Sequence, residues 1–242
     1  DQRDEILKQR NEISLKNNAL EKQNLLITDS INYAKTLQNL ILPLKSSLDN
    51  VFESFIIYKP KDIISGDFYW WSNLPEENEY IVGIIDCTGH GVPGAFMSML
   101  GNDLLDYIVN QKGIREPYKI VDELDKGIIK TLKQEVTDNM DGMDVILCRV
   151  KKYIDDKREI TYIGANRSLV YYKAKTKELL IDKGWDKTVG GVISFRPEYD
   201  FVDKNISLEK GDIIYIFSDG YASQLNENEK RFGSKRLFNL LK

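Results

Sequence analysis

The chain of 242 residues is poor in cysteine and histidine, which limits the chemistry open to it. Cys87 and Cys148 are its cysteines, and one pair is no disulfide framework, so we predict a reducing, cytoplasmic environment. A single histidine without a Cys-x-x-Cys motif excludes a tetrahedral zinc site. No apolar run approaches the roughly 18 residues of a membrane-spanning helix, and residues 1–5 do not resemble a signal peptide.

A dominant charge of one sign is also missing. The 34 basic and 38 acidic residues are interspersed and give a net charge of −4, so there is no basic surface for nucleic acid or anionic membrane. We therefore expect neither nucleic acid nor direct membrane contact in this segment. The chain does not begin with Met, and we interpret it as an excerpt that leaves room for an upstream sensor domain.

Glycine and proline are absent from residues 2–42, which predicts one long helix that ends at Pro43. An apolar residue recurs every seven positions, at Ile6, Ile13, Leu20 and Ile27, which is typical of a coiled-coil seam. The partner positions Gln9, Lys16 and Gln23 are polar. A homodimer through this stalk is favoured, and a solvated helix docked on its own domain is the alternative.

The apolar spacing changes after Ile27, where the residues form a broader face: Ile31, Ala34, Leu37, Leu40 and Ile41. We expect this face to pack on a globular domain. The chain then divides into a helical linker or stalk over residues 1–42 and a domain over residues 43–242. Our hypothesis is that a twist or separation of the stalk passes to the domain through this junction.

Short β-rich runs dominate beyond Pro43, with helical patterns clustered between them. We predict strands over residues 51–58, 67–71, 80–85, 145–151, 159–163, 168–174, 178–181, 199–205 and 212–218, and helices over residues 94–110, 117–135 and from 235 onward. Strands in consecutive groups argue against a doubly wound parallel sheet. They predict the α+β class, with antiparallel sheets covered by helices.

Three aspartates, Asp67, Asp86 and Asp219, lie at the boundaries of predicted strands with glycine at or near each. A hard divalent cation needs several oxygen ligands, and glycine lets the backbone approach it closely, so the pattern suits Mg²⁺ or Mn²⁺. Each aspartate alone is weak support, because Asp and Gly are common in turns. Gly211-Asp212 is interpreted as such a turn.

His90, between Gly89 and Gly91, follows Asp86 closely, and both a functional and a solvated loop interpretation stay open. A Ser-His-Asp hydrolase would need it as the base, but the Gly-x-Ser-x-Gly elbow is absent. The loop also lacks the Gly-Lys-Ser/Thr ending of a nucleotide-binding P-loop, so ATP binding is not expected.

Four motifs carry a family resemblance: Ser65-Gly66-Asp67-Phe68, Asp86-Cys87-Thr88-Gly89-His90-Gly91-Val92-Pro93-Gly94-Ala95, Gly164-Ala165-Asn166 and Phe217-Ser218-Asp219-Gly220. In this order they resemble the motifs of metal-dependent PPM protein phosphatases, in the bacterial branch of SpoIIE-like and RsbU-like serine phosphatases. The resemblance covers roughly residues 30–242. It implies an αββα sandwich of two antiparallel sheets flanked by helices, preceded by the long helix.

The resemblance also implies two divalent cations, Mn²⁺ or Mg²⁺, that activate a water for attack on phosphoserine or phosphothreonine. Asp86 would bridge both ions, the Cys87 carbonyl would bind one and Asp219 the other, and Asp67 would act close by through water. No covalent nucleophile is then needed. The accessory candidates are Asp141, Asp144, His90 and Gly220; for Asp141 and Asp144 a plain turn is an equal alternative.

Three departures from the family pattern stand out. Thr88 occupies the place of the family's histidine, and Ser223 that of an acidic residue. The family's last metal-binding aspartate has no counterpart before Lys242, which predicts either a domain lacking its C-terminal end or a catalytically impaired form.

The function predicted is a bacterial signalling phosphatase whose activity the stalk sets. Its substrate would be a phosphorylated regulatory protein, which in the relatives is often an anti-sigma-factor antagonist. The alternative is a phosphatase-fold regulatory or binding module without turnover.

Overall fold

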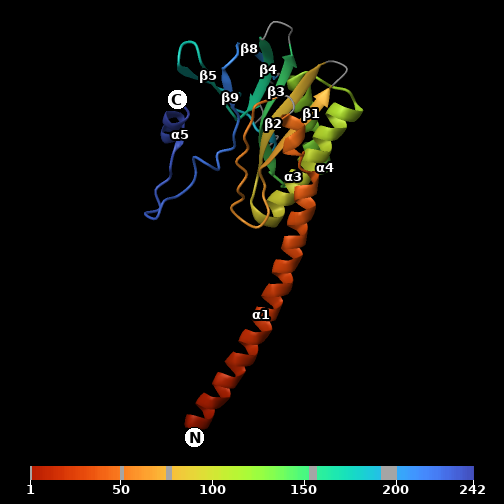
Figure 1. Ribbon diagram of the computed structural model, residues 1–242. Helices are drawn as coiled ribbons and strands as arrows, with labels where there is room; N and C mark the ends of the chain where they lie inside the picture. The colour runs from red at the N-terminus through yellow and green to blue at the C-terminus, as the bar shows by residue number, and fades with distance from the viewer. Residues whose placement is uncertain (1, 50–51, 75–77, 153–156, 192–200) are drawn as a thin grey trace.

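The computed structural model describes residues 2–49, 52–74, 78–152, 157–191 and 201–242. A long helix, α1 (Gln2–Ile41), projects from a globular part, as predicted (Figure 1). The other helices are α2 (Lys45–Asp49), α3 (Gly91–Asp106), the π-helix η2 (Tyr107–Gln111), α4 (Pro117–Thr131) and α5 (Ser234–Leu240). Within the described residues, no helix is both long and apolar enough to span a membrane.

Two antiparallel sheets form the centre of the domain. The strands are β1 (Phe68–Leu74), β2 (Glu79–Cys87), β3 (Gly142–Lys152), β4 (Arg158–Ala165), β5 (Leu169–Lys173), β6 (Glu178–Asp182), β7 (Val189–Gly190), β8 (Lys204–Leu208) and β9 (Ile213–Tyr215). The larger sheet has the order β1-β2-β3-β4-β8, with β7 paired to β3, and the smaller has the order β6-β5-β9. This arrangement confirms the α+β class.

Alternation along the central strands explains the layers. In β2, Ile81 and Ile85 belong to the core cluster that also holds Leu105 of α3 and Leu124 of α4. Val82 of the same strand belongs to a second cluster between the two sheets, which confirms a strand buried on both faces. On the far side of the smaller sheet lies α5 (Figure 1), where the Phe217 and Phe238 rings are 6.5 Å apart. The αββα sandwich is therefore confirmed.

The end of α1 docks on the domain, and the prediction is confirmed for Ile31, Ala34 and Ile41 and wrong for the other two positions. Gln38 is buried, whereas Leu37 and Leu40 are exposed. The covered residues follow helical spacing at Ile31, Ala34, Gln38 and Ile41. A polar side chain can occupy the centre of this face because the Gln38 amide is fully hydrogen-bonded, as described below.

One strand prediction was wrong over its described residues, and two others were wrong at one bound. No strand occurs over residues 52–58, although their burial alternates; this extended segment lies outside the ladders, with Phe52 packed edge-on against Tyr80. Residue 51 lies outside the described residues. Strand β8 begins only at Lys204, because Phe201 turns into the core instead of pairing. Residues 199 and 200 are not described. Strand β9 ends at Tyr215, which frees residues 216–218 to reach the site.

Candidate metal centre

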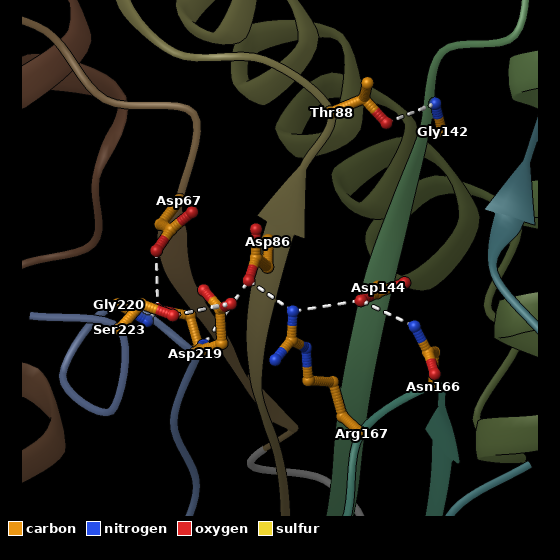
Figure 2. Close-up of polar contacts among 11 residues, drawn as sticks. Asp67, Asp86, Thr88, Gly142, Asp144, Asn166, Arg167, Asp219, Gly220 and Ser223 are labelled. Carbon is orange, nitrogen blue, oxygen red and sulfur yellow. Dashed lines mark hydrogen bonds and ion pairs between the residues drawn. The ribbon is translucent and has the colours of Figure 1, made fainter. Parts of the chain in front are cut away.

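Carboxylates from both sheets meet at one end of the sandwich (Figure 2). Asp67 directly precedes β1, Asp86 is the penultimate residue of β2, and Asp144 lies in β3. Asp219 follows β9 of the smaller sheet. The predicted aspartates therefore converge because neighbouring strands deliver them to the same edge.

Asp86 and Asp144 face each other directly across the β2–β3 ladder. Like charges in this position repel each other. The positive charge of Arg167 offsets this repulsion. Its Nη2 donates to Asp86 and, at 2.9 Å, to Asp144. Asn166 Nδ2 also donates to Asp144 at 2.9 Å. Burial raises the pKa of Asp144, while these two neighbours lower it.

Among the described residues, no cation forms an ion pair with the carboxylates on the other side of Asp86. Ser218 Oγ donates to Asp67 Oδ2 at 2.5 Å, and the Asp219 backbone N–H lies 3.5 Å from Asp86 Oδ2. Burial raises the pKa of Asp67 to about 6, and the charge of Asp86 adds to this effect. This side of the site is therefore short of positive charge.

Glycines allow the loops of the site to approach each other. A Cβ on Gly66 would lie 2.6 Å from the Gly89 carbonyl oxygen, and one on Gly94 would lie 2.5 Å from the same atom. Both distances are too short for any side chain. Gly89 itself has φ +88°, which glycine tolerates best. The loop before β1 and the loop after β2 are thereby held in contact.

Two accessory candidates lie apart from these carboxylates. His90 is exposed, and its Nδ1 lies 2.7 Å from Asp62 Oδ2. The Asp141 carboxylate accepts a hydrogen bond from Asn139 at 2.7 Å in its own turn. Gly220, in contrast, does border the site, since a Cβ there would lie 3.7 Å from Asp67 Oδ2.

The Cys87 thiol is not a candidate nucleophile. Burial raises its pKa well above the ordinary value, and the nearby Asp67 and Asp86 raise it further. The thiol therefore stays protonated, which leaves the carbonyl oxygen as the atom of Cys87 that is available as a candidate ligand. Both cysteines are free and buried.

Sequence reasoning missed several side chains of the site. Arg167 and Ser218 lie inside or next to the quoted motifs, and only the fold shows that they contact Asp86 and Asp67. Ser223, noted as a departure from the family, donates to Asp219 at 3.1 Å. Thr88, another departure, accepts from the Gly142 N–H at 3.0 Å and so ties the loop to β3.

The donor chemistry fits a hard divalent cation. Four carboxylates and a backbone carbonyl are oxygen donors of the kind that Mg²⁺ and Mn²⁺ prefer. The Arg167 guanidinium is a stand-in cation between two of them. Among the described residues, no three His, Cys, Asp or Glu side chains are close enough to hold one ion together. The carboxylates meet in pairs around Asp86.

This fold and its carboxylate edge define the class of PP2C-type phosphatase domains. The solved SiaA-PP2C domain of Pseudomonas aeruginosa matches 90% of this chain and 82% of its own, with a TM-score of 0.75 and 30% identity. The family model of Stage II sporulation protein E (SpoIIE) matches residues 76–242. The chain therefore belongs to the SpoIIE family.

Two further relatives are more distant. Phosphoserine phosphatase RsbU of Bacillus subtilis (strain 168) is 25% identical over 202 residues, which is 84% of this chain. The chain spans 56% of the length of RsbU. The RsbU and RsbW domains of Rv1364c from Mycobacterium tuberculosis match 74% of this chain and 46% of their own, with a TM-score of 0.54 and 16% identity. The latter similarity concerns the fold alone.

Proposed function

We propose that this chain is the catalytic domain of a metal-dependent protein serine/threonine phosphatase in signalling. The observation that carries the proposal is the meeting of four carboxylates, Asp67, Asp86, Asp144 and Asp219, at one end of the sandwich (Figure 2). Membership of the SpoIIE family and the likeness to RsbU support phosphate-ester hydrolysis as the reaction.

Asp86, Asp219 and the Cys87 carbonyl oxygen would hold two divalent cations, Mn²⁺ or Mg²⁺. When bound, such ions lower the pKa of a water molecule and offset negative charge on the phosphoryl group. Asp67 would orient the attacking water, since Ser218 fixes its carboxylate at 2.5 Å. The chain needs no covalent nucleophile for this reaction.

The test is hydrolysis of p-nitrophenyl phosphate and of a phosphoserine peptide with Mn²⁺. We expect Asp86→Asn to abolish turnover, because Asp86 lies at the centre of the carboxylate set. Asp122→Asn is the matched control, since Asp122 pairs with Lys126 on the exposed surface of α4. Full activity of Asp86→Asn would sink the proposal.

The regulatory part of the proposal rests on Gln38 at the docked end of α1. Its Nε2 donates to the Ser65 carbonyl at 2.7 Å and to Ser98 Oγ at 2.8 Å, and its Oε1 accepts from the Ser65 N–H at 3.0 Å. Ser65 lies two residues before Asp67. A movement of the stalk would therefore reach a predicted catalytic residue through a short, hydrogen-bonded path.

The stalk itself would form a homodimer through its exposed apolar residues, among them Ile6, Ile13, Leu20 and Ile27. Sedimentation of the chain with and without residues 1–30 tests this part. A dimer that becomes a monomer on truncation is expected. A monomer in both cases would remove the dimer from the proposal and leave the phosphatase reaction untouched.

The substrate would be a phosphorylated regulatory protein in the cytoplasm, of the type of an anti-sigma-factor antagonist. The likeness to RsbU, a phosphoserine phosphatase, supports a phosphoserine-bearing substrate, and the more specific type rests on the family resemblance. A panel of phosphoproteins is incubated with the wild-type chain and, separately, with Asp86→Asn. The substrate is the phosphoprotein that loses phosphate with the wild type and keeps it with Asp86→Asn.

A second candidate is a phosphatase-fold module that binds its partner without turnover. The observation in its favour is that Arg167 forms ion pairs with both Asp86 and Asp144. Binding of the phosphoprotein without release of phosphate at saturating Mn²⁺ would favour this candidate over the enzyme.

A further inference from the structure

Arg167 is the feature of the site that the predicted reaction does not use. Its guanidinium lies between Asp86 and Asp144 (Figure 2), and the same nitrogen, Nη2, donates to both carboxylates. The side chains of all three residues are largely buried, with 17%, 17% and 15% exposure for Arg167, Asp86 and Asp144. In a buried set of ion pairs, a ligand that binds one charged side chain also changes the free energy of the others, because it alters their charge balance.

The backbone fixes where this guanidinium can reach. Asn166 has φ +54°, and its N–H donates to the Trp185 carbonyl at 2.7 Å. The Trp185 N–H in turn donates to the Gly164 carbonyl at 2.7 Å. The turn between β4 and β5 therefore holds the base of the Arg167 side chain at the end of the sandwich, and only its outer atoms are free to change partner.

The present contacts satisfy the guanidinium only in part. Within the described residues, Arg167 Nε is buried and has no hydrogen-bond partner. An unpaired buried donor costs free energy, so this position of the side chain is not the best that a guanidinium can find. The formal charges are also unequal, because one guanidinium is shared by two facing carboxylates. Arg167 therefore compensates this pair only in part.

We propose that Arg167 is an internal counter-ion of Asp86 and Asp144 that competes with a divalent cation for Asp86. In the metal-free chain it relieves the repulsion of the two facing carboxylates. Loading of the site requires the Asp86 contact to be given up, and the Arg167 side chain then moves toward solvent. The inference rests on the proposed metal site but not on turnover.

The test compares the wild type with Arg167→Gln by calorimetric titration with Mn²⁺ and by thermal unfolding in chelator. We expect Arg167→Gln to bind Mn²⁺ about tenfold more tightly, because the ion no longer has to displace the guanidinium. In chelator the same variant should unfold at a temperature lower by about 4 °C or more, since the facing carboxylates lose their counter-ion. Unchanged or weaker Mn²⁺ binding would overturn the proposal.

Arg149→Gln is the matched control. Arg149 is also 17% exposed and pairs with Glu79 at 2.5 Å, but it contacts none of the site carboxylates in the described residues. We expect it to lower the unfolding temperature and to leave the affinity for Mn²⁺ unchanged. An equal gain of affinity in both variants would trace the effect to net charge and would overturn competition at the site.

A measurement on the unmodified chain covers the case in which Arg167→Gln fails to fold. The Nε–H signal of Arg167 in a ¹H–¹⁵N spectrum, assigned with Arg167→Lys, should shift on titration with Mg²⁺ as the group leaves its buried position. A signal that stays in place at saturating Mg²⁺ would contradict displacement.

Failure of this inference is distinguishable from failure of the proposed reaction. A wild type that turns over phosphoserine peptide, with Mn²⁺ affinity indifferent to Arg167, would sink only the inference. A wild type without turnover, whose Mn²⁺ affinity rises in Arg167→Gln, would sink only the reaction.

Discussion

The two sides of Asp86 differ in how their negative charge is balanced. Toward the larger sheet, Asp144 is compensated by Arg167 and Asn166. Toward the smaller sheet, Asp67 has the hydroxyl of Ser218 as its partner, and its pKa is raised to about 6. The comparison teaches that the chain balances one half of its carboxylate cluster with a cation of its own and pairs the other half only with hydroxyl and backbone N–H groups.

The largest expected effect is a difference in turnover between substitutions on the two sides of Asp86. Asp219→Asn removes a carboxylate from the uncompensated side and should lower turnover about 100-fold or more, because metal-assisted charge stabilisation is worth several kcal/mol. Asp144→Asn, on the compensated side, should cost less than about tenfold. Initial rates with p-nitrophenyl phosphate at saturating Mn²⁺ measure both. Equal losses would remove the functional difference between the sides.

The next effect concerns pH and the metal-free chain. The pKa of Asp67 is about 6 in the folded chain and lower in the unfolded one, so the native state binds the extra proton. The contribution of Asp67 to stability is therefore present below about pH 4 and is lost as pH rises through 6, by about 3 kcal/mol in all, of which about 2 kcal/mol falls between pH 4.5 and pH 7. Asp67→Asn should remove that loss.

Urea unfolding at pH 4.5 and pH 7 in chelator measures this difference. Asp203 must be controlled, because burial also raises its pKa to about 6, although it lies elsewhere and accepts from the Tyr118 N–H at 2.8 Å. The wild type and Asp67→Asn are therefore compared with the Asp203→Asn substitution present in both proteins. The same pH dependence with and without Asp67 would contradict the electrostatic account of this side.

The smallest expected effect is that of Ser218→Ala. It removes the hydrogen bond to Asp67 and should destabilise the chain at pH 7 by about 1 kcal/mol, while the pKa of Asp67 rises further. Ser223→Ala is the control, because the 3.1 Å hydrogen bond of Ser223 goes to the exposed Asp219 and is more open to water. Urea unfolding and a ¹³C titration of Asp67 provide the readouts. A larger effect from Ser223 would reverse the assignment of the stronger contact.

Periodicity made most of the fold predictable. The absence of glycine and proline from residues 2–42 predicted α1, and alternating or continuous apolar runs predicted the central strands. The prediction failed over residues 52–58, where an extended segment alternates in burial without joining a ladder. Alternation reports which side of an extended chain is covered and does not report whether its backbone is paired.

The site was predictable only as far as residue type carries chemistry. Asp67, Asp86 and Asp219 stood out because carboxylates beside glycine at strand ends suit a cation. Arg167 gave no such signal, since an arginine after a turn has many ordinary roles. Gln38 was hidden for a similar reason, because a polar residue on an apolar helix face reads as solvent-exposed until its hydrogen-bond partners are known.

The sequence by itself determined the long helix, the α+β class and the identity of the carboxylates, because these depend on local periodicity and on the chemistry of single residue types. Only the tertiary structure decided that Asp86 faces Asp144 across β2 and β3, with Arg167 between them. Register and the path of the β4–β5 turn set that arrangement. Both result from packing between segments far apart in the chain, which local patterns do not record.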